Sequence, residues 1–317
     1  MNTVFANLKN SRQSSFDKLT KKLQDMSKKG FQDDRFWTPT FTKAKTASAI
    51  IRFLPAPPGE EDPFVRVYSH AFTSGCFETP PRKEGMWYIE NSLTTIGKDD
   101  PVSEMNTKLW AQGKNSPGQK IVSGSPEGNV PGTKRKVNYY ANIYIVADPE
   151  APQNVGQVKL YKFGAQIYEK IDTATHPKYD EYVAFDPFDM WNGANLKLRI
   201  APNKGGYPQY TESEWDLVDE NGKKVPRGAL STDEQLLETI WKSEHSLQAF
   251  LKPDQFKSYN DLKARLSKVM GVDQVAPEEF KQATPPWEAE ENTSAPSNET
   301  EVNALDDELE MFKALRD

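Results

Sequence analysis

The chain has 317 residues, with 40 Lys or Arg against 46 Asp or Glu, and 36% of its residues are hydrophobic. Cys76 is the only cysteine, which excludes an intramolecular disulfide and fits a reducing compartment. No apolar run approaches the roughly 18 residues that a membrane span requires, so we expect a soluble protein with no membrane partner.

Charge is distributed unevenly along the chain. Residues 1–29 hold seven cations against two acids, a net charge of +5, whereas residues 273–317 hold thirteen acids against three cations, a net charge of −10. The intervening residues are nearly neutral. This pattern predicts a basic N-terminal arm (1–30), a folded body (31–272) and an acidic, flexible tail (273–317).

The arm is predicted to contain a short amphipathic helix. Ser14 or Ser15 can cap it, apolar residues recur at helical spacing from Phe16 to Met26, and Gly30 provides a stop. Lysines occupy the opposite face. Because so short a helix is marginal alone in water, we expect it to become ordered by docking on a partner.

The body shows many short strands separated by Pro and Gly, which favours a mainly β fold of the barrel or sandwich type with flanking helices. Strands are predicted at residues 48–58, 64–72, 86–93, 139–147, 158–164 and 195–201. A helix is predicted at 165–174. The segment 111–133 is rich in Gly, Ser and Pro and is predicted to be a flexible loop.

Two structural helices are predicted to close the body, at 231–251 and 258–271. The first begins with a capping box from Ser231 to Glu234. Beyond them, the final segment 301–317 regains helical spacing, with apolar residues among carboxylates. A short acidic amphipathic segment of this kind is typical of a docking peptide, and we assign partner docking to Leu305, Leu309 and Phe312.

Catalytic and metal-binding patterns are not found. The three histidines are scattered, and neither CxxC, HExxH nor a phosphate-binding glycine loop occurs. Asp99 and Asp100 could bind a divalent ion, but beside Gly97 and Pro101 they are predicted to be turn residues. The sequence therefore favours a binding protein over an enzyme.

The pattern that remains is cations next to aromatic residues. Cations neutralise phosphates, and flat rings stack on unpaired bases for about 1–3 kcal/mol each. The segment 132–149 places three consecutive cations directly before a tyrosine-rich strand, and "LYKF" (160–163) repeats the combination. From this pattern the candidate contacts to single-stranded nucleic acid are Lys134, Arg135, Lys136, Tyr140 and Lys162.

Alternation along this strand separates two faces. Lys136, Tyr140 and Tyr144 share one face, whereas Tyr139 shares the other with Val137, Ala141 and the isoleucines. The alternation predicts that Tyr139 belongs to the core, unless a bulge near Asn138 reverses the two faces.

Several motifs resemble the single-stranded-DNA-binding, helix-destabilising proteins of T-even-type bacteriophages, the gene 32 protein family. They are "IRFLP", "WYIE", "KRK" followed by "YYANI", "DPEAPQNVGQV", "YKFG", "WNGAN" and "GYPQYTESEW", which run in that order from about residue 50 to 215. The resemblance implies an OB-fold core with an inserted subdomain and an electropositive cleft. It also implies cooperative binding through the arm, and recruitment of phage replication and recombination proteins by the tail.

Individual roles follow from the resemblance. Arg52, Arg135 and Lys136 would contact phosphates. Base-stacking or cleft-lining positions would be Tyr139, Tyr161, Tyr207 and Tyr210. On Tyr139 the resemblance and the alternation disagree, so both Tyr139 and Tyr140 remain candidates. Self-association would use Arg12, Ser14 and Ser15 of "RQSS", followed by Lys18, although Gln13 replaces an expected cation.

The resemblance also implies a zinc ion held by one histidine and three cysteines, but this chain departs from that pattern. His70 stands at the histidine position, while the cysteine positions fall on Ser92, Val102 and Met105. We expect that the site is lost, that the protein has no cofactor, and that apolar packing of Val102, Met105, Leu109 and Trp110 holds the subdomain together.

The predicted function is cooperative, sequence-nonspecific binding of single-stranded DNA in phage replication, recombination and repair, in the cytoplasm of an infected bacterium. Two alternatives belong to other classes. An RNA-binding OB-fold protein would prefer ribose strands. A metal-dependent nuclease would need clustered carboxylates, which the sequence does not show.

Overall fold

The computed structural model describes residues 33–179, 183–203, 205–216 and 228–272. Strands are β1 (Phe36–Trp37), β2 (Ala47–Phe53), β3 (Phe64–Thr73), β4 (Trp87–Asn91), β5 (Gly124–Ser125), β6 (Val130–Pro131), β7 (Lys136–Ala147), β8 (Val158–Phe163), β9 (Leu196–Pro202), β10 (Pro208–Gln209) and β11 (Glu214–Trp215). Helices are α3 (Pro101–Trp110), α4 (Pro117–Ser123), α5 (Ala165–Thr175), α6 (Glu234–Lys242) and α7 (Tyr259–Met270). Short 3-10 helices are η1 (Ser74–Phe77), η2 (Leu93–Ile96), η3 (Glu127–Asn129), η4 (Pro152–Asn154), η5 (Gln248–Leu251) and η6 (Pro253–Gln255).

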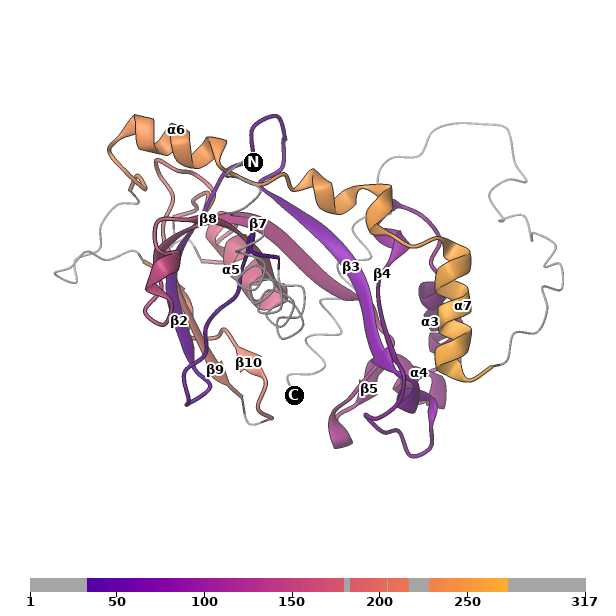
Figure 1. Ribbon diagram of the computed structural model, residues 1–317. Helices are drawn as coiled ribbons and strands as arrows, with labels where there is room; N and C mark the ends of the chain where they lie inside the picture. The colour runs from indigo at the N-terminus through magenta and orange to yellow at the C-terminus, as the bar shows by residue number, and fades with distance from the viewer. Residues whose placement is uncertain (1–32, 180–182, 204, 217–227, 273–317) are drawn as a thin grey trace, which may run out of the picture. The chain divides into compact units, whose positions relative to one another are not determined.

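One large, mainly antiparallel sheet organises the fold (Figure 1). Its strand order is β1-β8-β7-β2-β9-β10, with β11 also paired to β9, and β3 paired to both β7 and β4. Tyr210, directly after β10, packs against the cluster that contains Tyr161 of β8 from near the other end of this order, so the sheet curves strongly. The fold is therefore mainly β with several helices, as predicted.

The twelve-residue strand β7 shows how sequence alternation becomes a core. Tyr139, Ala141, Ile143 and Ile145 are buried and pack with residues of β2, β8, β9 and α5. The opposite face is covered by the segment that contains η5, which packs on Tyr140, and by α6, whose Leu237 and Ile240 share a cluster with Tyr144. Burying these apolar side chains together with Ile167 and Ile171 of α5 removes them from water, which is the main stabilising contribution.

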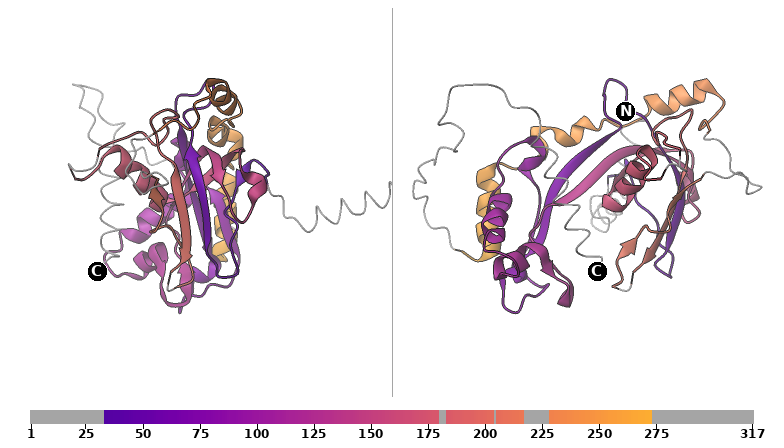
Figure 2. Two further views of the ribbon diagram at one scale, coloured as in Figure 1. Left: turned by 90° about the vertical axis from the view of Figure 1, so that its left-hand side faces the viewer. Right: turned by 180° about the vertical axis from the view of Figure 1, so that it is seen from behind.

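A second cluster lies where β3 extends beyond its pairing with β7 and pairs with β4 in the same sheet. Phe72 of β3 and Tyr88 of β4 stack at 4.9 Å and pack with apolar residues of α3 and α7. Figures 1 and 2 show α3 and α7 next to each other beside this strand pair. This cluster gives the region 64–135 and α7 a core of their own.

The six predicted strands correspond to β2, β3, β4, β7, β8 and β9, and the helix predicted at 165–174 is α5. Other predictions were wrong. The loop 111–133 contains α4, β5 and β6. The helix predicted at 231–251 ends at Lys242, and Asp233, not Ser231, caps it by accepting the Gln235 and Leu236 N–H groups. Among the described residues no helix is long and apolar enough to cross a membrane.

Candidate nucleic-acid interface

The pairing of β3, β7 and β8 brings together cations from distant parts of the sequence. Lys136 on β7 lies opposite Ser69 on β3, and Lys162 on β8 lies opposite Tyr140 on β7. Opposed residues in a sheet point to the same face, so Lys136 and Lys162 share one face. Arg135 precedes Lys136 and points to the other face.

Five cations of this region lack an acidic partner in the part of the chain that the structure describes. Within the described residues, no carboxylate lies at ion-pair distance from the five that we call the basic ribbon: Arg66, Lys134, Arg135, Lys136 and Lys162. Some cations elsewhere are paired, as in Lys197–Asp216 at 2.8 Å and Arg199–Glu214 at 3.0 Å. An uncompensated group of like charges destabilises a fold, so its presence indicates an anionic ligand.

The electrostatics of the two lysines support this interpretation. Burial, and secondly the charge of Lys134, lowers the pKa of Lys136. Burial, and secondly the charge of Lys136, lowers the pKa of Lys162. Each ammonium group is therefore held near another cation without an acid to offset it. A phosphate placed between them would relieve that repulsion and return both pKa values toward normal.

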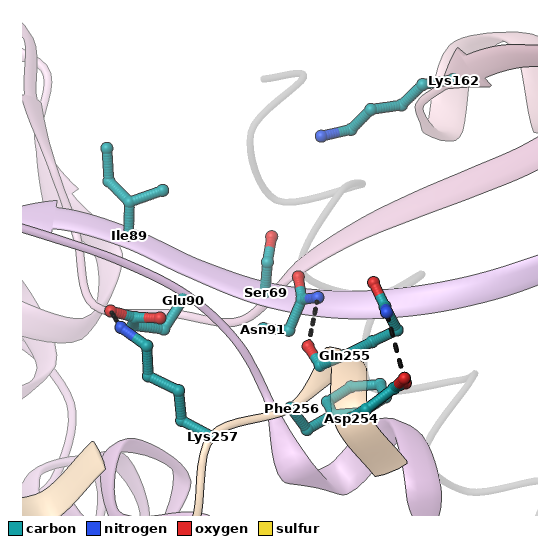
Figure 3. Close-up of a pocket in the computed structure, with 9 residues that line it drawn as sticks. All are labelled: Ser69, Ile89, Glu90, Asn91, Lys162, Asp254, Gln255, Phe256 and Lys257. Carbon is teal, nitrogen blue, oxygen red and sulfur yellow. Dashed lines mark hydrogen bonds and ion pairs between the residues drawn. The ribbon is translucent and has the colours of Figure 1, made fainter. Parts of the chain in front are cut away.

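A groove of about 420 Å³ opens on this face (Figure 3). Figure 3 shows Lys162 from β8 and Ile89 from β4 pointing into the same space, with Ser69 of β3 between them. Ile89 is 62% exposed and offers an apolar surface to a base. Residues 254–257 line the groove as well. Of the two acids that line it, Glu90 is paired with Lys257 at 2.6 Å and with Arg265 at 2.9 Å, and Asp254 accepts a hydrogen bond from Gln255 Nε2 at 3.2 Å.

On the other face, two arginines flank one tyrosine. The Arg135 guanidinium lies 3.8 Å from the ring centroid of Tyr68, and that of Arg66 lies 5.0 Å away. Arg135 also donates from Nη1 to Thr94 Oγ1 at 3.0 Å. Cations over an aromatic ring leave their outer edges free for phosphate oxygens. Arg66 and Tyr68 were missed at the sequence level, although alternation in "VRVYSH" places them together with His70.

The structure answers the question left open for Tyr139 and Tyr140. Tyr139 is 7% exposed and stacks on Tyr168 of α5, with ring centroids 4.4 Å apart, so it belongs to the core. Tyr140 is half-buried, with one ring face on Phe250 at 4.5 Å and the Lys162 ammonium 5.8 Å from its centroid. The alternation was right about Tyr139. In the folded protein the ring of Tyr139 is not accessible to a base.

The prediction for Arg52 was wrong. This side chain on β2 is 2% exposed, and its Nη2 donates to the carbonyl oxygens of Asp189 at 2.9 Å and Gly228 at 2.8 Å. Burial lowers the pKa of Arg52 to about 10, while the nearby Asp189 partly offsets this. The guanidinium therefore joins β2 to two remote loops and is not available to a phosphate.

The remaining predicted tyrosines differ in exposure. Tyr161 is 2% exposed and packs edge-on against Trp37 at 5.3 Å, so it is a core residue, contrary to a base-stacking role. Tyr210 is half-buried and packs against the same core, and its N–H donates to Gln166 Oε1 at 2.8 Å. Tyr207, 47% exposed in the turn before β10, is accessible for stacking.

The residues predicted for self-association (Arg12, Ser14, Ser15 and Lys18) and for partner docking (Leu305, Leu309 and Phe312) lie outside the described residues. Their roles stay predictions.

Comparisons with known proteins identify the family of this chain. The model of the family described as "gp32 DNA binding protein like" matches residues 45–270. The chain belongs to the gp32 family. A single-stranded DNA-binding protein of Enterobacteria phage T2 is 31% identical over 253 residues, which cover 78% of this chain and 74% of the relative. Its counterpart from Enterobacteria phage T4 is 30% identical over 251 residues, covering 77% and 73%. The gp32 family consists of binding proteins and not of enzymes.

The zinc site expected of this family can be tested against the residues present. Of its four positions only His70 could ligate a metal, because Ser92 lacks a thiolate and Val102 and Met105 pack in the apolar cluster. In the described parts of the chain no three His, Cys, Asp or Glu side chains are grouped to hold a metal ion. The residues at these positions do not fit zinc.

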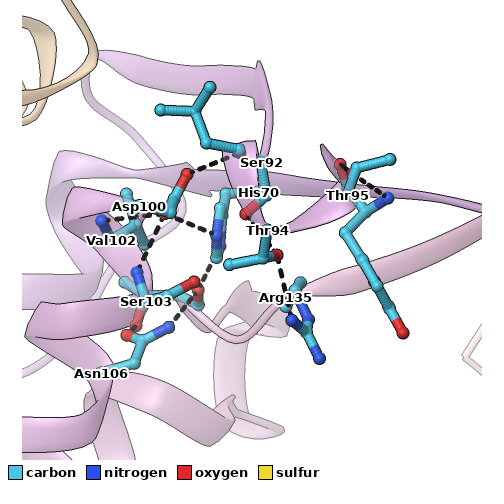
Figure 4. A network of polar contacts seen from close by, with 12 residues as sticks. His70, Ser92, Thr94, Thr95, Asp100, Val102, Ser103, Asn106 and Arg135 are labelled. Atoms are coloured by element: carbon cyan, nitrogen blue, oxygen red, sulfur yellow. Dashed lines mark hydrogen bonds and ion pairs between the residues drawn. The ribbon is translucent and has the colours of Figure 1, made fainter. Parts of the chain in front are cut away.

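A polar network occupies this place (Figure 4). His70 Nε2 lies 3.3 Å from Asp100 Oδ1, an electrostatic contact without the alignment of a hydrogen bond. Asp100 caps α3, contrary to its prediction as a turn residue. Its burial alone would raise the pKa of Asp100, but His70 and backbone N–H donors outweigh this and lower it to about 2. The carboxylate is thus charged at neutral pH.

The apolar cluster predicted to replace the metal is confirmed only in part. Val102 is fully buried and Met105 packs against the cluster, but Trp110 is 39% exposed. Leu109 is half-buried. The cluster is instead completed by Leu262 and Leu266 of α7, from the far end of the body, which the local pattern around residue 105 could not indicate.

Proposed function

We propose that this protein binds single-stranded DNA along the basic ribbon, without reading its sequence. The observation that carries the proposal is the group of five cations without acidic partners around the β3–β7 pair, in a chain of the gp32 family. Phosphates would contact Lys136 and Lys162 on one face and Arg66 and Arg135 on the other. Bases would lie against Ile89, Tyr68 and Tyr207.

The finer features of the proposal come from the charge layout and the family. The curved sheet would act as an OB-fold core, and the basic arm 1–30 would contact the next protein along the strand, which makes binding cooperative. The acidic tail 273–317 would recruit replication, recombination and repair proteins. The protein would work in the cytoplasm of an infected bacterium.

The test is a titration of purified protein with short oligo(dT), followed by tryptophan fluorescence at several salt concentrations. We expect binding to oligo(dT), much weaker binding to duplex DNA, and a linear fall of log K with log salt of about 0.7 per phosphate contacted. Equal affinity for duplex DNA would contradict the proposal. Tighter binding to oligo(rU) would favour RNA as the ligand, and degradation of DNA on adding magnesium would indicate a nuclease.

Truncations separate the finer roles from binding itself. Removing residues 1–15 should abolish cooperativity on long strands and spare binding to a short oligonucleotide. Removing residues 273–317 should raise the affinity for single strands at low salt, if the tail covers the cleft when DNA is absent. Unchanged affinity would exclude that covering role without affecting recruitment.

A further inference from the structure

Asp100 connects two segments of the region between β4 and β7. Its carboxylate is 1% exposed. Oδ2 accepts the N–H of Leu93 in η2 at 3.1 Å, and Oδ1 accepts the N–H groups of Val102 and Ser103 in α3, both at 3.0 Å. One buried charge thus holds the start of η2 and the start of α3 together, and three donors stabilise it.

His70 extends this connection to β3 and to the segment leading into β7. Its Nε2 faces Asp100, and its Nδ1 lies 3.0 Å from the carbonyl oxygen of Thr133. Asn106 of α3 binds the same residue twice, from Nδ2 to the Thr133 carbonyl at 2.9 Å and as acceptor of the Thr133 hydroxyl at 2.6 Å. The backbone two residues before Arg135 is therefore fixed to both α3 and β3.

The side chain of Arg135 is fixed by η2, the segment that Asp100 holds. Thr94 Oγ1 accepts its Nη1–H, and Ser92 hydrogen-bonds Thr94 at 3.0 Å. The ring under the guanidinium is held by the same segment, because the Ser92 N–H donates to the Tyr68 carbonyl at 2.8 Å and the Tyr68 N–H donates to Thr95 Oγ1 at 2.9 Å. Figure 4 shows this path from Asp100 to Arg135.

We propose that Asp100 is a positioning residue for DNA binding: with His70 it fastens η2 and α3 to β3 and β7, in place of a metal ion, and so holds Arg135 over Tyr68 ready for a phosphate. The inference rests on the proposed function. An unrestrained arginine loses considerable side-chain entropy on binding, and the network removes most of that cost in advance. Lys162 has no contact with the network and does not depend on it.

The distinguishing experiment is a double-mutant cycle on the affinity of the full-length protein for a short oligo(dT). Asp100→Asn keeps the cap of α3, since Asn also caps helices, but turns an amide toward the Leu93 N–H. We expect Asp100→Asn to weaken binding about fivefold and to lower the salt slope by about 0.7. In the Arg135→Ala background it should have almost no further effect.

Lys162→Ala is the matched control. Asp100→Asn should weaken this variant by the same factor as the wild type, because the two sites act independently. A general loss of folding would instead weaken binding in every background, and an undiminished effect of Asp100→Asn in the Arg135→Ala protein would overturn the proposal. If Asp100→Asn fails to fold, the same cycle is run with Thr94→Val, which removes the acceptor of Arg135 together with the Ser92–Thr94 hydrogen bond.

Two further outcomes separate this inference from the proposed function. Wild-type protein that binds oligo(dT) but shows no coupling between Asp100 and Arg135 contradicts the inference alone, whereas wild-type protein that does not bind contradicts both. Metal analysis provides a readout independent of DNA. About one zinc ion retained per chain would show that a metal, and not the carboxylate, fastens this region.

Discussion

Arg52 in β2 and Arg135 directly before β7 both lie close to aromatic residues in the sequence, yet their surroundings in the fold are opposite. Arg52 is enclosed by β2 and two remote loops, and its guanidinium donates hydrogen bonds to their backbone carbonyls. Arg135 lies on the ring of Tyr68 with a single hydroxyl as acceptor and with Arg66 nearby. The first stabilises the fold, and the second remains available to a ligand.

The comparison teaches that the partners of a cation, more than its neighbours in sequence, indicate its role. Carbonyl acceptors around Arg52 compensate its charge where water cannot. Around the basic ribbon no such compensation is present among the described residues, so the charge is left for something outside the chain. Substitutions in the two regions should therefore change different measured quantities.

The largest effect is expected for Arg52→Ala. Removing the guanidinium leaves the carbonyls of Asp189 and Gly228 buried without their donor, and should lower the free energy of unfolding by about 3–5 kcal/mol. Denaturant unfolding measures this. At low temperature, where the variant remains folded, its affinity for oligo(dT) should match the wild type. A stable variant with weak DNA binding would reverse the roles assigned here.

A smaller effect, on binding, is expected for Arg135→Ala. Loss of one phosphate contact should weaken oligo(dT) binding about tenfold and reduce the salt slope by about 0.7. The free energy of unfolding should fall by only about 1 kcal/mol, since one partly exposed hydrogen bond and one cation–π contact are removed. An unchanged salt slope would show that Arg135 makes no phosphate contact.

Glu244 extends the comparison to an acid, because its carboxylate oxygens are buried with no cation of the described residues beside them. Its burial, and secondly the charge of Glu60, raises the pKa of Glu244 to about 8, which the Asn142 amide only partly offsets. The folded state then binds more protons than the unfolded state between about pH 4.5 and 8, so stability falls as pH rises through this window.

Glu244→Gln should therefore remove the loss of folding stability that Glu244 causes as pH rises. We expect the variant to be more stable than the wild type by about 1 kcal/mol at pH 8.5, with little difference at pH 4.5. Thermal unfolding at the two pH values measures it. A gain that is the same at both values would point to packing, and not to proton binding, as its cause.

Local patterns in the sequence predicted the six main strands, α5 and the core face of β7, because alternation and turn residues act within a few positions. They failed where partners come from far away. The carbonyl that accepts a hydrogen bond from the buried Arg52 lies 137 positions later in the sequence. The helix that completes the apolar cluster around Val102 is α7, which is also distant in the sequence. Asp100 was predicted to be a turn residue because Pro101 follows it, but proline is favoured at the first position of a helix, and α3 begins at Pro101.

The candidate site divides in the same way. The triplet Lys134–Lys136 was found from its local charge, and alternation correctly assigned Tyr139 to the core. Arg66 and Tyr68 could have been found, since they alternate in one strand, but their relation to Arg135 depends on the register of β3 with β7. Strand register between segments 70 residues apart is not readable from either segment alone.

The most direct test of the account compares the salt dependence of oligo(dT) binding by the wild type and by a variant with Arg66, Arg135, Lys136 and Lys162 all replaced by Gln. The account predicts that the slope of log K against log salt shrinks by about 2–3 while far-ultraviolet circular dichroism stays unchanged. A folded variant that retains the wild-type slope would contradict it, because the phosphates would then be bound elsewhere.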